Sequence, residues 1–386
     1  MVALLVGSEK EGDDRIESAG DSPEGMLREL MSHSPEQRVM LVENSERFRS
    51  VELCELALKR GFELGLEDPP EAESMISLAV AIADSFQLAD LAQETVFDIR
   101  ARAYAHLGNT RRIRSDLVGS EVAFDRARMN WSAGSRDPRV EAIICDLEAA
   151  LLSERREFDS AMDLLERAIQ RFEVEGDRHL VGRTWLSKAF VLGAKGDFHE
   201  AIEALEEGIS LVEPEAEPRL ALLAKHNLLV FLREEGRLGE IEDLLPDTRM
   251  THSRLGNSVD LMRFKWLEGQ IAVDSDRWSE AEGLFVEVKQ FFVEKGMAHD
   301  VALVSLDLAH VYLRQDRIAE LKSLAAEMLT IFRAHRVHQD TLAALAFCRK
   351  ALEVEKLTVG LVSELAACLE TARERARFGV GLSVAE

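Results

Sequence analysis

Bulky apolar residues recur along the chain at intervals of 40 residues, each at the end of a short charged segment. They are Phe158, Phe198, Leu238, Trp278 and Ile318. Mostly apolar or small residues follow each of them three, seven and ten positions further on, which is the spacing of one face of an α-helix. One helical hairpin cannot bury such a face alone, whereas several stacked hairpins can. The pattern therefore predicts a solenoid of helix pairs.

The predicted fold class is all-α, with about seven antiparallel helix pairs, because strand-like alternation of apolar and polar residues is absent from the sequence. Residues 1–22 are acidic and poor in apolar residues, which is typical of a disordered segment. The solenoid is expected over 23–376. Its predicted parts are N-terminal helices over 23–46, repeats over about 47–337 and capping helices over 338–376, followed by a flexible tail over 377–386.

Capping residues mark several helix ends near the N-terminus. Ser34 followed by Pro35 predicts a helix that begins there and ends near Asn44. A longer helix is expected from about 47 to 66, and Asp68 is expected to cap the next one.

The charge of the chain argues against two classes of partner. It carries 71 acidic and 47 basic residues, a formal net charge of -24. Such a protein repels nucleic-acid phosphates and anionic lipid surfaces, so neither nucleic acid nor a membrane is an expected direct partner. The acidity itself is typical of a solvated outer face that keeps a long solenoid soluble.

The cysteines and the first residues indicate a cytoplasmic protein. Cys54, Cys145, Cys348 and Cys368 lie far apart without a C-x-x-C pair, so reduced packing cysteines are expected rather than disulfides or a zinc site. The first apolar stretch is too short for a signal peptide, and no stretch approaches the length of a membrane span.

The repeats resemble those of the tetratricopeptide-repeat family. Its pattern of large and small residues is matched in one unit by Trp185, Ala189, Leu192, Gly196, Phe198, Ala201, Leu205, Gly208 and Pro214, and in part of an earlier unit by Tyr104, Leu107 and Gly108. The period of 40 exceeds the family's usual 34, so each helix is expected to be about a turn longer. Long-period arrays of this kind look like those of bacterial regulators, including Rap-type phosphatase regulators and the sensor arms of MalT-like activators. The resemblance implies a right-handed superhelix.

The resemblance also implies that the first helices line a concave groove. Groove positions are then counted from the small residue at which paired helices cross, such as Ala189 or Gly269. The groove residues implied in this way are Arg183, Phe190, His226, Asn227, Arg233, Arg263, Trp266, Gln270 and His310. Arginines among aromatic side chains suit an acidic or C-terminal peptide segment. The alternative is that Phe190 and Trp266 pack between repeats and that the arginines pair with neighbouring carboxylates.

No motif for catalysis or nucleotide binding occurs in a supporting context, so the chain is expected to be neither an enzyme nor a cofactor protein. His335 and His338 lie three apart, and His179 and His299 share a repeat corner, but a metal site would need a third ligand. The leading hypothesis is a bacterial scaffold that binds a partner protein or peptide in its groove. The alternative is a peptide- or ligand-responsive sensor that controls a signalling or transcription partner.

Overall fold

The computed structural model describes residues 22–65, 68–87, 91–114, 116–212, 217–324 and 327. The described residues form two compact units that divide between Glu213 and Pro214. Below, the part up to Val212 is called unit 1 and the part from Glu217 is called unit 2. Each unit is described by itself.

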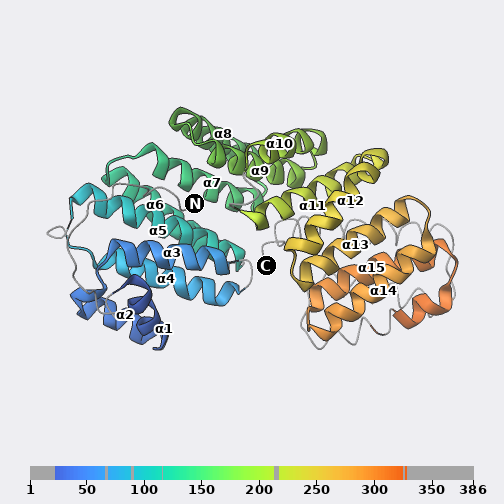
Figure 1. The fold of residues 1–386 in the computed structure, drawn as a ribbon, viewed down its shortest axis with the longest axis horizontal. Helices are drawn as coiled ribbons and strands as arrows, with labels where there is room; N and C mark the ends of the chain where they lie inside the picture. The colour runs from blue at the N-terminus through green and yellow to red at the C-terminus, as the bar shows by residue number, and fades with distance from the viewer. Residues whose placement is uncertain are drawn as a thin grey trace. The chain divides into compact units, whose positions relative to one another are not determined.

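Unit 1 is built from helices without a strand among its described residues (Figure 1). Its helices are α1 (Pro23–Met31), α2 (Pro35–Asn44), the 3₁₀ turn η1 (Glu46–Phe48), α3 (Val51–Leu64), α4 (Pro69–Ser85), α5 (Gln93–Ile113), α6 (Leu117–Ala133), α7 (Pro138–Glu154), α8 (Phe158–Glu175), α9 (Arg178–Lys195) and α10 (Phe198–Leu211).

Unit 2 continues the same pattern of helices in its described part. Its helices are α11 (Pro218–Glu234), α12 (Leu238–Leu255), α13 (Ser258–Asp274), α14 (Trp278–Glu294) and α15 (Ala298–Arg314). Consecutive helices pack as hairpins, α3 with α4, α5 with α6, and so on to α13 with α14. The all-α class and the paired helices predicted from the sequence are thereby confirmed.

The 40-residue period marks the starts of the second helices of these pairs. The helices α8, α10, α12 and α14 begin at Phe158, Phe198, Leu238 and Trp278, the apolar residues from which the repeat was read. The first helices, α7 to α15, also begin 40 residues apart, at positions 138, 178, 218, 258 and 298. The predicted phase of the repeat is therefore confirmed.

A left-handed residue closes the turn between the helices of each later pair. These residues also recur every 40 positions, and they are Arg156, Gly196, Gly236, Asp276 and Asp316, with φ between +55° and +97°. The next backbone N–H then bonds a carbonyl five residues back, as Arg237 N does to Leu232 O at 2.9 Å. This bond satisfies a carbonyl that the helix end leaves free, and it stops the helix in a fixed direction.

Small residues lie where the two helices of a pair cross. Ala149, Ala161, Ala189, Ala201 and Ala281 are all buried, at 0% or 1% exposure. A Cβ placed on Gly269 would lie 2.5 Å from the ring of Phe285, and one on Gly108 would lie 2.8 Å from the ring of Phe124. The close approach of the backbones thus depends on the absence of larger side chains.

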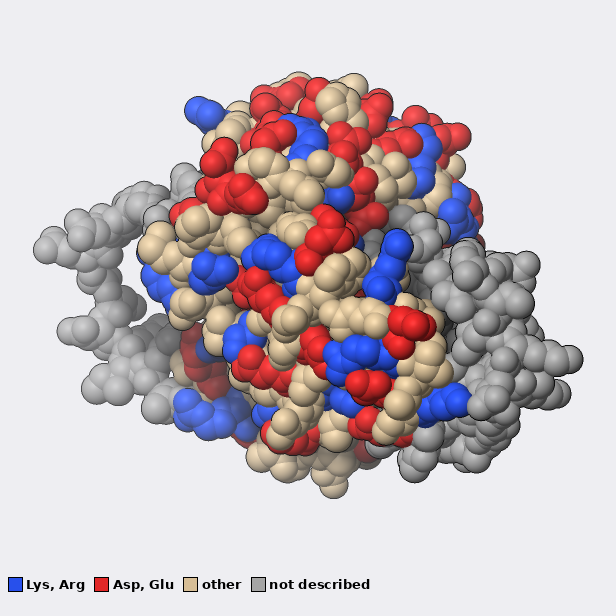
Figure 2. Space-filling view, turned by 90° about the vertical axis from the view of Figure 1, so that its right-hand side faces the viewer, with Lys and Arg blue, Asp and Glu red and all other residues tan. Residues whose placement is uncertain are grey.

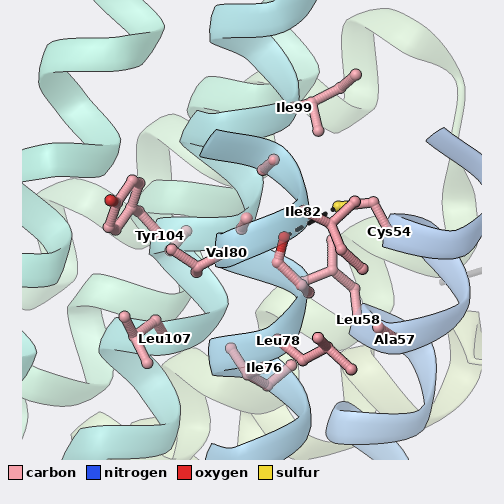
Figure 3. Close-up of a cluster of buried hydrophobic side chains, with 14 of the residues drawn as sticks. Cys54, Ala57, Leu58, Ile76, Leu78, Val80, Ile82, Ile99, Tyr104 and Leu107 are labelled. Carbon is pink, nitrogen blue, oxygen red and sulfur yellow. Dashed lines mark hydrogen bonds between the residues drawn. The ribbon is translucent and has the colours of Figure 1, made fainter. Parts of the chain in front are cut away.

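The core of unit 1 fills the layers between α3, α4 and α5 (Figure 3). Cys54 is fully buried there, and its thiol donates to the carbonyl of Ala79 at 3.4 Å. Burial raises the pKa of this thiol to about 12. Cys54 and Cys145 are thus packing residues, free and protonated.

Two details near the N-terminus refine the predicted helix limits. The helix expected from about 47 begins at Val51, because the Ser50 side chain accepts a bond from Leu53 N and residues 46–48 form the 3₁₀ turn. The Ser34 cap, the end of α2 at Asn44 and the Asp68 cap agree with the prediction. Most of the segment predicted to be disordered, the capping helices 338–376 and the tail 377–386 lie outside the described residues. So do Pro214, His335, His338, Cys348 and Cys368.

Candidate partner-binding surfaces

The groove residues inferred from the sequence fall into both units. Arg183 and Phe190 lie on α9 in unit 1, whereas His226, Asn227 and Arg233 lie on α11, Arg263, Trp266 and Gln270 on α13, and His310 on α15. All of these helices are first helices of their pairs. Their surroundings differ greatly between the two units.

In unit 2 the arginines are bound by carboxylates of the next first helix. Arg233 is buried on α11 and forms an ion pair with Asp274 on α13, with its Nη2 3.2 Å from Oδ1. Arg263 is buried on α13, and its Nη2 lies 3.4 Å from Oδ1 of the equally buried Asp300 on α15. Arg219, which the sequence did not single out, pairs with the buried Asp260.

Trp266 and Gln270 share a single carboxylate. The indole Nε1 and the amide Nε2 each donate to Oδ2 of Asp307 on α15, both at 2.7 Å. Trp266 is 8% exposed, so its ring also belongs to the core, where it meets Phe292 edge to face at 6.4 Å. Asp307 was missed from the sequence.

These contacts follow one geometric rule. The partners are 37 or 41 residues apart, as in Arg263–Asp300 and Trp266–Asp307. One period of 40 leads to the equivalent position on the next first helix, and the two spacings differ by four, so both partners lie on the same face of that helix. The polar groups thus form a ladder between successive first helices, which agrees with the ion-pair alternative for Arg233 and Arg263.

A second cluster in unit 2 holds two histidines. His252 on α12 is 1% exposed, stacks on Phe264 with 4.3 Å between ring centroids, and its Nδ1 lies 2.9 Å from the carbonyl oxygen of Thr248. His226 on α11 lies 5.5 Å from His252, ring to ring. Removal from water lowers the pKa of both histidines, and each stays neutral near pH 7. Asn227 is buried, and His310 faces Trp278 at 6.4 Å.

In unit 1 the first helices carry a more open cluster. The guanidinium of Arg183 on α9 lies 5.3 Å from the ring centroid of Phe62 on α3, and Phe62 meets His106 on α5 edge to face at 6.2 Å. Three first helices therefore contribute to one cluster, which we call the Phe62 cluster. Phe62 is 39% exposed.

The rest of the unit 1 face is polar and only partly buried. Arg102 on α5 forms an ion pair with Glu55 on α3, and both side chains are about one third exposed, at 30% and 38%. Phe190 is half-buried. Sequence reasoning missed Phe62, His106 and Arg102, because the step between the units around α5 and α7 is 41 residues rather than 40.

The surface charge is mixed. On the face shown in Figure 2, acidic and basic side chains alternate, and neither sign covers a large area. Many of them pair between neighbouring helices, as Arg249 does with Glu268 at 2.5 Å. Exposed pairs of this kind contribute little stability, about 0–1 kcal/mol each, but they leave few cations for a partner.

The described residues contain no group of three His, Cys, Asp or Glu side chains placed to hold a metal ion. Within the same residues, no helix combines the length and the apolar character needed to cross a bilayer. The buried carboxylates of unit 2 face arginine, indole and amide donors instead.

No protein-family model matches the sequence, and no curated protein matches it either. Solved structures do share the fold. A Rap protein in complex with competence and sporulation factor has a TM-score of 0.63 at 11% identity, over 85% of this chain and 89% of that one. The apo quorum sensor NprR from B. thuringiensis has a TM-score of 0.59 at 14% identity, over 85% of this chain and 97% of that one.

A third neighbour is a signal-transduction ATPase from Pyrococcus horikoshii with a tetratricopeptide-repeat sensor. It has a TM-score of 0.61 at 10% identity, over 95% of this chain and 54% of that one. At these identities the likeness concerns the fold. The chain is a tetratricopeptide-like helical-repeat protein.

Proposed function

We propose that this protein is a non-enzymatic scaffold of the cytoplasm that binds a partner protein or peptide on the first-helix face of unit 1. The observation that carries the proposal is the Phe62 cluster, in which α3, α5 and α9 place Phe62, His106 and Arg183 together. An aromatic ring that is 39% exposed beside a guanidinium is the kind of anchor that dominates protein interfaces.

Unit 2 supports this choice by contrast. A ligand of Arg233, Arg263 or Trp266 would have to replace Asp274, Asp300 or Asp307, and breaking a buried pair costs about 3–5 kcal/mol. The partner-binding role inferred for the unit 2 residues therefore receives less support than that of Arg183 and Phe190.

The chemistry of the cluster indicates what it would bind. Arg183 can take a carboxylate with two parallel hydrogen bonds while it remains stacked on Phe62. Phe62 and His106 offer ring edges to an apolar neighbour of that carboxylate. The proposed ligand is thus an acidic segment with an adjacent apolar side chain.

The test compares two substitutions with a matched control on the same helix. Partners captured by the wild-type protein are titrated against purified Arg183→Ala, Phe62→Ala and Arg178→Ala proteins. Arg178 is exposed at the start of α9, outside the cluster. The two cluster variants should lose about 1–2 kcal/mol of binding free energy each, and the control should lose none.

Salt provides the second readout. Binding through Arg183 should weaken as ionic strength rises, and this dependence should be smaller for Arg183→Ala. A partner that binds all four proteins equally would refute the assignment of the site.

The alternative function is a sensor that responds to a peptide. Its support is that one neighbour of the same fold was solved with a bound factor and another is a quorum sensor. A sensor should change shape on binding, so its small-angle scattering profile should differ between the free and peptide-bound states. A scaffold should keep the same profile.

A further inference from the structure

A pocket of about 690 Å³ lies in unit 1, on the side of the second helices and away from the Phe62 cluster. It opens between α4 and α6, with α5 as its floor and α2 and Arg49 at one end. Its floor is apolar, and Figure 3 shows the floor residues Val80, Tyr104 and Leu107 on the opposite side of α4 from Cys54 and Ala57. The volume is that of a typical small-ligand site.

Arg49 is the least satisfied cation of this pocket. Its side chain is only 16% exposed, and its Nε is buried without a hydrogen-bond partner among the described residues. The carboxylate that lies near it in that part of the chain belongs to Glu46, at 3.7 Å, and Glu46 is 91% exposed. A buried guanidinium group without a close acceptor is unusual and calls for an anion.

The other charged groups of the pocket do not fill this role. Asp84 accepts a bond from the Tyr104 hydroxyl at 2.7 Å and lies 3.6 Å from Arg100 Nε. Arg126 donates to the same hydroxyl at 3.1 Å and stacks over the Tyr104 ring. Arg126 has no carboxylate within ion-pair distance among the described residues, so it adds a second available positive charge.

Two further charged residues complete the lining. Arg111 lies 3.6 Å from Glu73 and donates to the carbonyl of Gly119 at 3.2 Å. Glu43 is exposed at the rim. The pocket therefore combines an apolar floor with an excess of positive charge, in a protein whose net charge is -24.

We propose that this pocket binds an organic anion, namely a carboxylate attached to an apolar body. Arg49 and Arg126 would hold the carboxylate, while the apolar body would lie on Val80, Leu107 and Ala123. Two sources share this chemistry, a free amphiphilic acid and the C-terminal residue of a peptide. Inorganic phosphate has the charge without the apolar body and is expected to bind much more weakly.

The first test uses octanoate, octanol and inorganic phosphate as probes of the full-length protein. Calorimetric titration should show saturable octanoate binding, at least tenfold tighter than binding of octanol or phosphate. In Arg49→Gln the affinity for octanoate should fall at least fivefold. The matched control is Arg47→Gln, two residues away and paired with Glu29 outside the pocket, which should bind like the wild type.

A second variant guards against loss of folding. Ala81 lines the pocket from α4 and is half-buried, so Ala81→Phe fills the cavity without a change of charge. This variant should keep its helical circular dichroism and lose octanoate binding. Equal affinity for octanoate and octanol, or unchanged octanoate binding in either Arg49→Gln or a folded Ala81→Phe, would overturn the proposal.

The source of the carboxylate is separated by a pair of peptides. A short peptide that ends in leucine with a free carboxylate is compared with its C-terminal amide. Preference for the free acid over the amide, with competition by octanoate, identifies a peptide end as a ligand. Binding of octanoate alone identifies a small amphiphilic acid.

Discussion

Single residues decide where the helices of this protein stop. At Gly236 the backbone has φ of +70°, and no other atom lies within 4 Å of the position that a Cβ would take. Any cost of a side chain there arises from the backbone alone. Gly239, three residues later in α12, is equally open but has helical geometry.

These two glycines give a prediction with opposite signs. Gly236→Ala should lower the free energy of unfolding by about 1–2 kcal/mol, the cost of a left-handed conformation for a residue with a Cβ. Gly239→Ala should raise it by about 0.5–1 kcal/mol, because alanine loses less entropy in a helix. Urea denaturation of both variants measures the difference. Changes of the same sign would contradict the role given to the turn.

Residue-level predictions from the sequence succeeded where the information was local. The starts of α8, α10, α12 and α14 could be predicted because the charged turn and the apolar residue after it are adjacent in sequence. The environment of Arg263 could not, since its partner Asp300 lies 37 residues away on another helix. Sequence spacing alone left the groove and the ion-pair interpretations of Arg263 open.

At the scale of elements, the hairpin of α13 and α14 depends on one crossing point. A Cβ on Gly269 would lie 2.5 Å from the Phe285 ring, whereas Gly283 on the exposed side of α14 has open space. Gly269→Ala should therefore cost about 1–3 kcal/mol by overpacking, and Gly283→Ala should stabilise by about 1 kcal/mol. Thermal denaturation checks both. A stable Gly269→Ala protein would show that the hairpin can separate without cost.

The helix α12 is the exception among the hairpin helices of unit 2. Its buried residues are Ile241, Thr248, Thr251 and His252, and it contains Pro246 in its interior. The 40-residue pattern predicted a helix here, but it did not predict that the buried face would be mostly polar. Such a face gains little from the hydrophobic effect and depends on its hydrogen bonds.

This composition makes unit 2 sensitive to acid. Since the folded state lowers the pKa of His226 and His252, the unfolded chain takes up protons first as the pH falls below about 6.5. The stability from the neutral histidines is complete above that pH and is lost as the pH falls toward the lowered values. His252→Phe should keep the stack on Phe264 and flatten the decline in unfolding free energy between pH 7 and 5.

The control for this prediction is the exposed His199 on α10, at 64% exposure. His199→Ala should leave the slope of unfolding free energy against pH unchanged. If His252→Phe has the same slope as the wild type, the buried histidines do not determine the acid sensitivity.

At the scale of the whole molecule, the fold was predictable because one period repeats. Each repeat states the same information again, so departures such as Leu229 and Ile241 in place of small residues did not hide it. The candidate sites were less predictable. Phe62 and Arg183 meet although three helix pairs separate them in sequence, and their contact depends on the curvature of unit 1.

The division into two compact units has a measurable consequence. The ladder that joins α13 to α15 lies within unit 2, so a break there should act mainly on unit 2. Asp307→Ala would leave the donors of Trp266 and Gln270 buried without their acceptor, at a cost of about 1–3 kcal/mol for each group. Native-state hydrogen exchange should then show faster opening of α13, α14 and α15, while α3 to α6 keep their protection. Asp243→Ala, an exposed change on α12, serves as the control. An equal loss of protection in α3 to α6 would mean that the two units unfold as one cooperative body.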